Sequence, residues 1–263
     1  MTLRPLARAA LALAVIVGAF GLAATPAQAA PAVHYVALGD SYSSGVGAGP
    51  YQSTCLRSNR SYAALWAAAN SPASFRFVAC GGAVTADVLD SQLSALDAST
   101  TMVTVTIGGN DAGFVDVVLN CRLGSESACA TTVDRAERFA TNELPGRLDA
   151  TYAAIKQRAP NAQLIVLGYP RLFEEPRYCG LLAISLTKRA IINDAADLLA
   201  DVTAARAAAA GATFVDTRRQ FAGHGVCGAT PWINDFSALI GAYHPNVAGY
   251  RDGYLAALNT VTG

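Results

Sequence analysis

The sequence predicts an α/β protein built on a parallel sheet of five strands with helices on both faces. Five short apolar runs rich in β-favouring residues recur along the chain, and longer segments of helical character separate them. This alternation of strand and helix is the pattern of doubly wound parallel sheets. Neither an internal repeat nor a shift of composition divides the later chain, so we expect a single domain over residues 30–263.

The elements follow in order along the chain. The strands are predicted over residues 33–38, 74–79, 101–107, 163–168 and 212–216. The helices are predicted over residues 61–70, 85–96, a segment ending near 120, 131–159, 184–210 and 247–258. We expect Thr85 to cap the second helix and Pro145 to interrupt the long helix. The residues between Cys121 and Cys129 are expected to form a loop.

Residues 1–29 are expected to be a signal peptide that is removed. Arg4 and Arg8 precede an apolar stretch over residues 9–24, which ends at Ala27-Gln28-Ala29, a small-x-small cleavage pattern. The stretch is short and lies beside that cleavage site, so a retained membrane anchor is the less favoured interpretation. The chain has many arginines and alanines but few lysines, which indicates a high-GC bacterial genome. We therefore expect a secreted bacterial protein.

Charge and cysteine content exclude several classes of function. The formal net charge is zero, and about −2 once the arginines of the leader are removed, so nothing favours nucleic acid or an anionic membrane as a partner. The six cysteines of an exported chain predict disulfides, and their spacing matches no common zinc site, so no metal is expected. Fifteen pairings are formally possible. We favour the sequential set Cys55–Cys80, Cys121–Cys129 and Cys179–Cys227.

Three strands end in residues that suit catalysis. Ser41 follows the first strand, Gly82 the second and Asn110 the third. A parallel sheet brings these strand ends to one rim, where ligands bind, and a serine on a tight turn there can present its hydroxyl to a substrate. Each residue alone has an ordinary interpretation, since Ser41 or Asn110 can belong to a helix cap and a glycine can serve packing. Their coincidence at one rim favours a site.

A serine nucleophile needs a base, and the sequence offers three histidines. His34 lies at the opposite end of the first strand. His224 lies in a loop near Cys227 and suits a structural or exposed role. His244 precedes Pro245 at the head of the last helix, where the loop can turn back over the rim. His244 is therefore the favoured base.

Four ordered blocks, GDSYSSG, CGGA, IGGND and YHPN, resemble the GDSL esterases and lipases of the SGNH hydrolase superfamily. The similarity extends over essentially the whole mature chain and is greatest to small secreted lipases and phospholipases of streptomycete type. It implies a three-layer α/β/α sandwich on a five-stranded parallel sheet, with six cysteines paired sequentially. It also makes Ser41 the nucleophile and His244 the general base. The backbone N–H groups of Ser41 and Gly82 and the Asn110 amide would form the oxyanion hole.

One position departs from that family. An acid usually lies three residues before the histidine, but here the residue is Gly241, followed by Ala242. We expect a Ser41–His244 dyad in which the carbonyl of Ala242 or Gly241 holds the imidazole N–H. Asp235, in the same loop, is the rival partner.

The resulting expectation is a secreted serine hydrolase that cleaves carboxylic esters of lipids through an acyl-enzyme, as a monomer and without cofactor or lid. A phospholipase A1 or a broad esterase is the near alternative. A carbohydrate acetylesterase and a non-catalytic secreted binding protein are more distant. The chain has no GxSxG, which disfavours the ordinary α/β-hydrolase elbow, and no P-loop or GxGxxG after a strand, which disfavours nucleotide binding.

Overall fold

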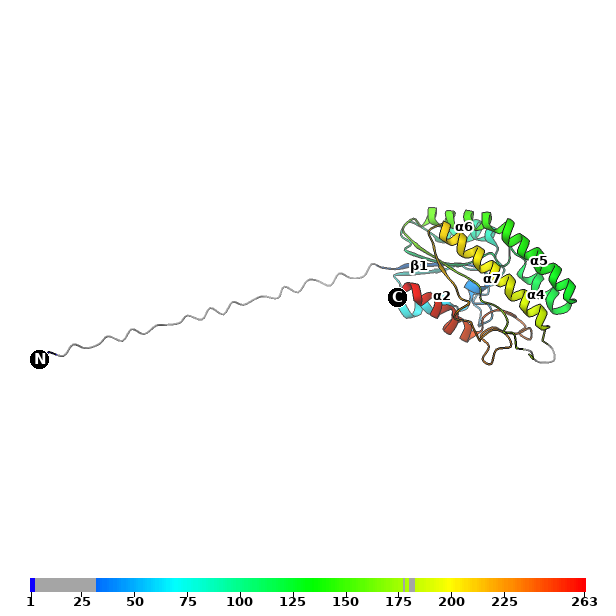
Figure 1. The fold of residues 1–263 in the computed structure, drawn as a ribbon. Coiled ribbons are helices and arrows are strands. Elements are labelled where there is room, and N and C mark those ends of the chain that lie inside the picture. The colour runs from blue at the N-terminus through cyan, green and yellow to red at the C-terminus, as the bar shows by residue number, and fades with distance from the viewer. Residues whose placement is uncertain (3–31, 177, 180–182) are drawn as a thin grey trace. The chain divides into compact units, whose positions relative to one another are not determined.

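Five parallel strands form one sheet in the order β2-β1-β3-β4-β5, which confirms the predicted fold class (Figure 1). They are β1 (His34–Gly39), β2 (Ser74–Phe77), β3 (Met102–Thr106), β4 (Gln163–Leu167) and β5 (Thr213–Val215). This computed structural model describes residues 1–2, 32–176, 178–179 and 183–263. Almost all of the expected signal peptide therefore lies outside the described residues. The sheet belongs to the unit Ala32–Gly263, which is described by itself below.

Alternate residues of the strands build two cores, one on each face of the sheet. In β1 the side chains of Tyr35 and Ala37 are buried on one face, while Val36 and Leu38 are buried on the other. The first core includes residues of α2 (Tyr62–Asn70), and the second includes residues of α6 (Leu144–Arg158). Figure 1 shows α2 and α6 on opposite sides of the sheet. Both faces are covered, as a parallel sheet requires.

The remaining helices complete these layers. They are α1 (Ser41–Ser44), α3 (Thr85–Asp87), the π-helix η1 (Val88–Gln92), the 3₁₀ turn η2 (Leu93–Ala95), α4 (Phe114–Leu123), α5 (Glu126–Asn142), α7 (Leu186–Ala209), the π-helix η3 (Gly249–Leu255) and α8 (Ala256–Thr262). The long helix α7 runs beside α5 and α6 (Figure 1).

Several expected helix boundaries are wrong. The segment predicted over residues 131–159 begins earlier than expected, at Glu126. The interruption expected at Pro145 is confirmed, because α5 ends at Asn142 and Pro145 lies in the first turn of α6, where its missing N–H costs nothing. The predicted helix over 85–96 passes from α to π to 3₁₀ geometry. Its N-cap is Val84, not Thr85.

The three disulfides join Cys55 to Cys80, Cys121 to Cys129 and Cys179 to Cys227. The expected loop between Cys121 and Cys129 is wrong, because the two cysteines lie on α4 and α5 and their bond fastens these helices together. The bond between Cys55 and Cys80 fixes the loop after β2 against the loop after α1, and the Gly81 N–H also donates to the Cys55 carbonyl at 2.9 Å.

The strand order reverses between β1 and β3, which are neighbours in the sheet although β2 lies between them in sequence. Ligands of open α/β sheets bind at the carboxyl ends of the strands where the order reverses. Gly39 of β1 is paired with Thr106 of β3, so the segments that follow them start side by side. Ser41 and Asn110 belong to those two segments.

Candidate active site

The turn that carries Ser41 is held by the two residues before it. Gly39 has φ +117°, and a Cβ there would lie 2.3 Å from the Thr106 carbonyl oxygen, so only glycine fits. Asp40 caps α1 by accepting a hydrogen bond from the Tyr42 N–H at 3.0 Å. Ser41 is thereby the first residue of a one-turn helix at the rim of the sheet, and it is only 8% exposed.

The structure places His244 directly against Ser41. Its Nε2 lies 2.7 Å from Ser41 Oγ, and its Nδ1 lies 2.9 Å from the Ala242 carbonyl oxygen. A carbonyl can only accept, so Nδ1 carries the hydrogen and Nε2 is free to accept the serine proton. Asp235 is turned elsewhere, because its carboxylate accepts from the N–H and hydroxyl of Ser237. The other two histidines contact Ser74 and Thr230 and lie apart from this pair.

Two glycines let the histidine loop approach the serine loop. A Cβ on Gly241 would lie 2.5 Å from the Gly47 Cα, and one on Gly47 would lie 2.4 Å from the Pro245 carbonyl oxygen. The Asn234 amide donates to the carbonyls of both glycines, at 3.0 and 3.3 Å. Asn234 also pairs through its backbone with His244 and Tyr243. The position of the imidazole is therefore set by backbone contacts that no short motif encodes.

Asn110 and Gly82 lie in neighbouring loops. One N–H of the Asn110 amide donates to the Ala83 carbonyl at 2.9 Å, which leaves its second N–H for the site. Asp111 accepts from the hydroxyl and N–H of Thr85, at 2.6 and 2.9 Å, and so joins the same two loops. Gly82 has φ +83°. Unlike Ser41 and Asn110, Gly82 is not part of the lining of the pocket described below.

A buried hydrogen-bond network lies beneath the nucleophile. The Asp40 carboxylate accepts from the Thr106 hydroxyl at 2.6 Å and from the Tyr169 hydroxyl, which in turn accepts from the Gly109 N–H at 3.1 Å. Tyr169 thus links the turn of Ser41 to the loop of Asn110. Burial raises the pKa of Asp40 to about 6, although these hydrogen bonds act in the opposite direction.

Two aromatic rings pack against the imidazole, which is half-buried. The Tyr42 ring lies 4.9 Å from that of His244, centroid to centroid, and the Phe114 ring meets it edge-on at 5.7 Å. The Tyr42 hydroxyl donates to the Tyr243 carbonyl at 2.6 Å. Burial lowers the pKa of His244 to about 4, and the hydrogen bond to Ala242 opposes that shift only in part. The imidazole is neutral at pH 7, as a general base must be.

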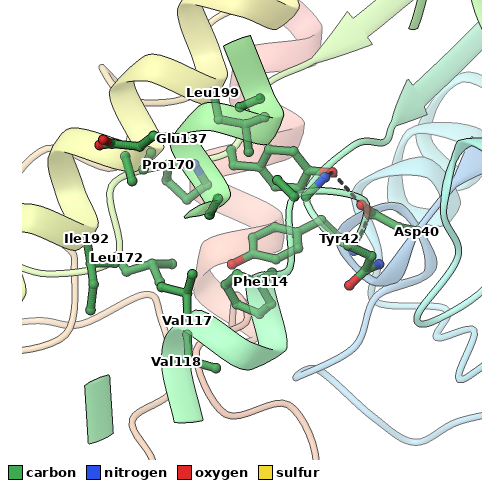
Figure 2. Close-up of a pocket in the computed structure, with 18 of the residues that line it drawn as sticks. Asp40, Tyr42, Phe114, Val117, Val118, Glu137, Pro170, Leu172, Ile192 and Leu199 are labelled. Atoms are coloured by element: carbon green, nitrogen blue, oxygen red, sulfur yellow. Dashed lines mark hydrogen bonds between the residues drawn. The ribbon is translucent and has the colours of Figure 1, made fainter. Parts of the chain in front are cut away.

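An apolar pocket opens beside Ser41 and Asn110. Figure 2 shows Val117 and Val118 of α4 on one side and Leu172 and Ile192 on another, with the Glu137 carboxylate at the end away from Asp40. Four alanines of α5 and α7 provide room in the wall, namely Ala136, Ala140, Ala195 and Ala196. The lining is suited to a hydrocarbon chain.

The described part of the chain contains neither a cluster of metal ligands nor a helix able to span a membrane. No group of three His, Cys, Asp or Glu residues that could hold a metal ion is present within it. Among those same residues, no helix combines the length and apolar character needed to cross a bilayer.

Comparison with known proteins identifies the family of the chain. Residues 37–251 match the GDSL-like lipase/acylhydrolase family. The chain belongs to that family. It is accordingly a carboxylic ester hydrolase. This GDSL-like hydrolase is 50% identical to Lipase 1 of Streptomyces coelicolor over 241 residues, which cover 90% of this chain and 89% of that lipase.

Two crystal structures share its fold over nearly their whole length. The hydrolase is 48% identical to a phospholipase A1 from Streptomyces albidoflavus, with a TM-score of 0.85 over 88% of this chain and 99% of that one. It is 47% identical to an extracellular lipase from Streptomyces rimosus, with a TM-score of 0.86 over 88% of this chain and 100% of that one.

Sequence reasoning missed several residues that position the site of this GDSL-like hydrolase. Tyr169 lies two residues beyond β4, so the argument from strand ends that selected Ser41 and Asn110 applies to it as well. Asp111 follows Asn110 in the IGGND block, and its carboxylate accepts from the Thr85 hydroxyl. For Asn234 the sequence contains no comparable signal.

Proposed function

We propose that this GDSL-like hydrolase is an exported enzyme that cleaves fatty acyl esters of lipids through an acyl-enzyme on Ser41. The observation that carries the proposal is the 2.7 Å contact between His244 Nε2 and Ser41 Oγ at the mouth of an apolar pocket. The disulfides and the expected signal peptide support export.

In the first step the Ser41 oxygen attacks the ester carbonyl carbon while its proton passes to His244 Nε2. The imidazolium that forms is stabilised by the Ala242 carbonyl, which accepts from Nδ1. The negative charge on the former carbonyl oxygen is met by N–H donors of Ser41, Gly82 and Asn110. When the tetrahedral intermediate collapses, the C–O bond to the leaving group breaks and the alkoxide takes the proton from Nε2.

The acyl-enzyme is then hydrolysed by the same groups. A water molecule gives a proton to His244 Nε2 and attacks the acyl carbon, and collapse of the second intermediate returns the proton to Ser41 and releases the fatty acid. No carboxylate takes part in this scheme. A dyad of this kind retains the oxyanion hole and substrate positioning, from which much of the rate enhancement comes.

The pocket supports a long acyl chain over an acetyl group. Its lining is mostly apolar and extends from Ser41 as far as Glu137 of α5 and Leu199 of α7, well beyond the reach of an acetyl group. This observation disfavours a carbohydrate acetylesterase. A phospholipase A1 is the second candidate, supported by the high identity to a structurally characterised enzyme of that name.

Hydrolysis of p-nitrophenyl esters from acetate to palmitate, with phosphatidylcholine alongside, tests the proposal. We expect turnover by the unaltered protein that rises beyond acetate, and loss of turnover in Ser41→Ala. A fluorophosphonate should label the unaltered protein and not Ser41→Ala, since labelling needs an activated serine. Absence of both turnover and labelling would favour the non-catalytic binding protein. Release of the acid from position 1 of the phospholipid would favour the phospholipase A1.

A further inference from the structure

Exposed apolar side chains gather beside the active site. In residues 32–263 every exposed large apolar side chain that the structure describes lies in α4, at Tyr178, at Leu186 where α7 begins, or between residues 236 and 247. We define the rim patch as six of them, Val115, Leu119 and Leu123 of α4 and Phe236, Leu239 and Ile240 of the loop before His244. Leu239 is 103% exposed and Leu123 74%.

The two halves of the rim patch are in contact. The Arg122 guanidinium of α4 lies over the Phe236 ring at 4.9 Å. Val115, Leu119 and Leu123 are spaced four residues apart, so they form one stripe along α4. The same helix contributes Val117 and Val118 to the apolar pocket, so α4 carries half of the rim patch and also forms part of the pocket wall.

The loop half of the patch adjoins the catalytic histidine. Ile240 immediately precedes Gly241 and Ala242, and the Ala242 carbonyl holds the imidazole. Gly241 packs on Gly47 and so fixes the base of this loop, while Leu239 extends into solvent. A surface that contacts Leu239 would therefore lie next to Ser41.

We propose that the rim patch is the docking surface for a neutral lipid–water interface, such as a zwitterionic phospholipid bilayer. The inference rests on the proposed function, since an acyl chain must leave an aggregate to reach the pocket. Exposed apolar clusters of this kind mark interaction sites, and apolar side chains enter the boundary between head groups and acyl chains. Helix α4 carries half of the patch and also lines the pocket, so a lipid surface on the patch would lie against the helix that borders the acyl site.

Charge around the patch selects a neutral surface. Arg122, a cation, is accompanied by the acidic Asp116 of the same helix and by Asp235 of the loop, and no run of lysines or arginines borders the six residues. Binding to anionic lipid requires clustered basic residues and weakens with salt. Binding by the rim patch should therefore need no anionic lipid and should be insensitive to salt.

The test measures co-sedimentation with phosphatidylcholine vesicles, using Ser41→Ala as the background so that the bilayer stays intact. Leu239→Asp together with Ile240→Asp, and separately Leu119→Asp on α4, should each weaken vesicle binding at least about tenfold. Ala73→Asp is the matched control, because Ala73 is an exposed loop residue just before β2, at the amino end of the sheet. It should bind as the background does.

The same substitutions in the active protein separate docking from catalysis. We expect unchanged kcat/KM on a soluble short-chain p-nitrophenyl ester and lower turnover on vesicles. Unchanged vesicle binding in both patch variants, or equal loss in Ala73→Asp, would overturn the inference. If light scattering shows that the protein is a dimer and that the patch substitutions dissociate it, the inference is overturned and a second copy of the chain is the occupant of the patch. If the active protein without patch substitutions binds vesicles but does not hydrolyse the soluble ester, the proposed function is refuted instead.

Discussion

Tyr169→Phe should destabilise the protein by removing one oxygen from the network beneath Ser41. The Tyr169 hydroxyl donates to the Asp40 carboxylate and accepts from the Gly109 N–H. Without it, Asp40 Oδ2 and the Gly109 N–H have no other hydrogen-bond partner among the described residues. A buried polar group left unpaired costs about 1–3 kcal/mol, and two such groups are left here, so we expect the free energy of unfolding to fall by about 2–6 kcal/mol at pH 8.

The loss should depend on pH with a definite sign. Burial raises the pKa of Asp40 to about 6, so folding gains from this group at acid pH, and the gain is lost as the pH rises through about 6. The Tyr169 hydroxyl opposes that rise, and Tyr169→Phe raises the pKa of Asp40 further. One unit of pKa is about 1.4 kcal/mol. The destabilisation should therefore be about 1–2 kcal/mol larger at pH 8 than at pH 5.

Urea unfolding at pH 5 and pH 8 measures both quantities, and Tyr152→Phe supplies the control. Tyr152 is also a fully buried tyrosine, but its hydroxyl has no hydrogen-bond partner among the described residues. Removing that hydroxyl should leave stability unchanged or slightly raised at both pH values. Equal losses in the two variants, or a Tyr169→Phe loss that is the same at pH 5 and pH 8, would refute the link between Tyr169 and the Asp40 carboxylate.

Three further predictions concern catalysis. Because burial lowers the pKa of His244 to about 4, kcat/KM should stay constant from pH 8 to about pH 5 and fall as the pH drops through about 4. Below that pH the imidazole is protonated and cannot accept the serine proton. A fall of kcat/KM near pH 6.5 would contradict this prediction. Asp235→Ala should change kcat less than about twofold, because its carboxylate contacts Ser237 and not the imidazole; a thousandfold loss in a folded variant would refute the dyad. Ala195→Leu narrows the pocket and should shift the preference among p-nitrophenyl esters towards shorter acyl chains. The kcat/KM on the acetate ester should stay within about threefold of that of the unaltered protein. An unchanged chain-length preference would place the acyl chain elsewhere.

The sheet was predictable because its strands are short apolar runs that alternate with helices. Parallel strands connected in this way have their carboxyl ends at the same edge of the sheet. Ser41 and Asn110 follow strands that pair directly, so the rim argument needed no long-range information. The helices were less accessible. The π geometry of η1 and the cysteines inside α4 and α5 depend on tertiary packing and on a disulfide, which local periodicity does not report. The break at Glu143 was predictable, because Pro145 marks it.

The structure explains why Gly241, and not an acidic residue, lies three residues before His244. Gly241 has φ +89°, and a Cβ there would lie 2.5 Å from the Gly47 Cα, so an aspartate would force the histidine loop away from the serine loop. The same close approach turns the chain so that the Ala242 carbonyl reaches His244 Nδ1. The backbone conformation that excludes a carboxylate at residue 241 therefore supplies a carbonyl acceptor for the imidazole in its place. A chain of this fold can have the acid at this position or the close packing of the two loops, but not both.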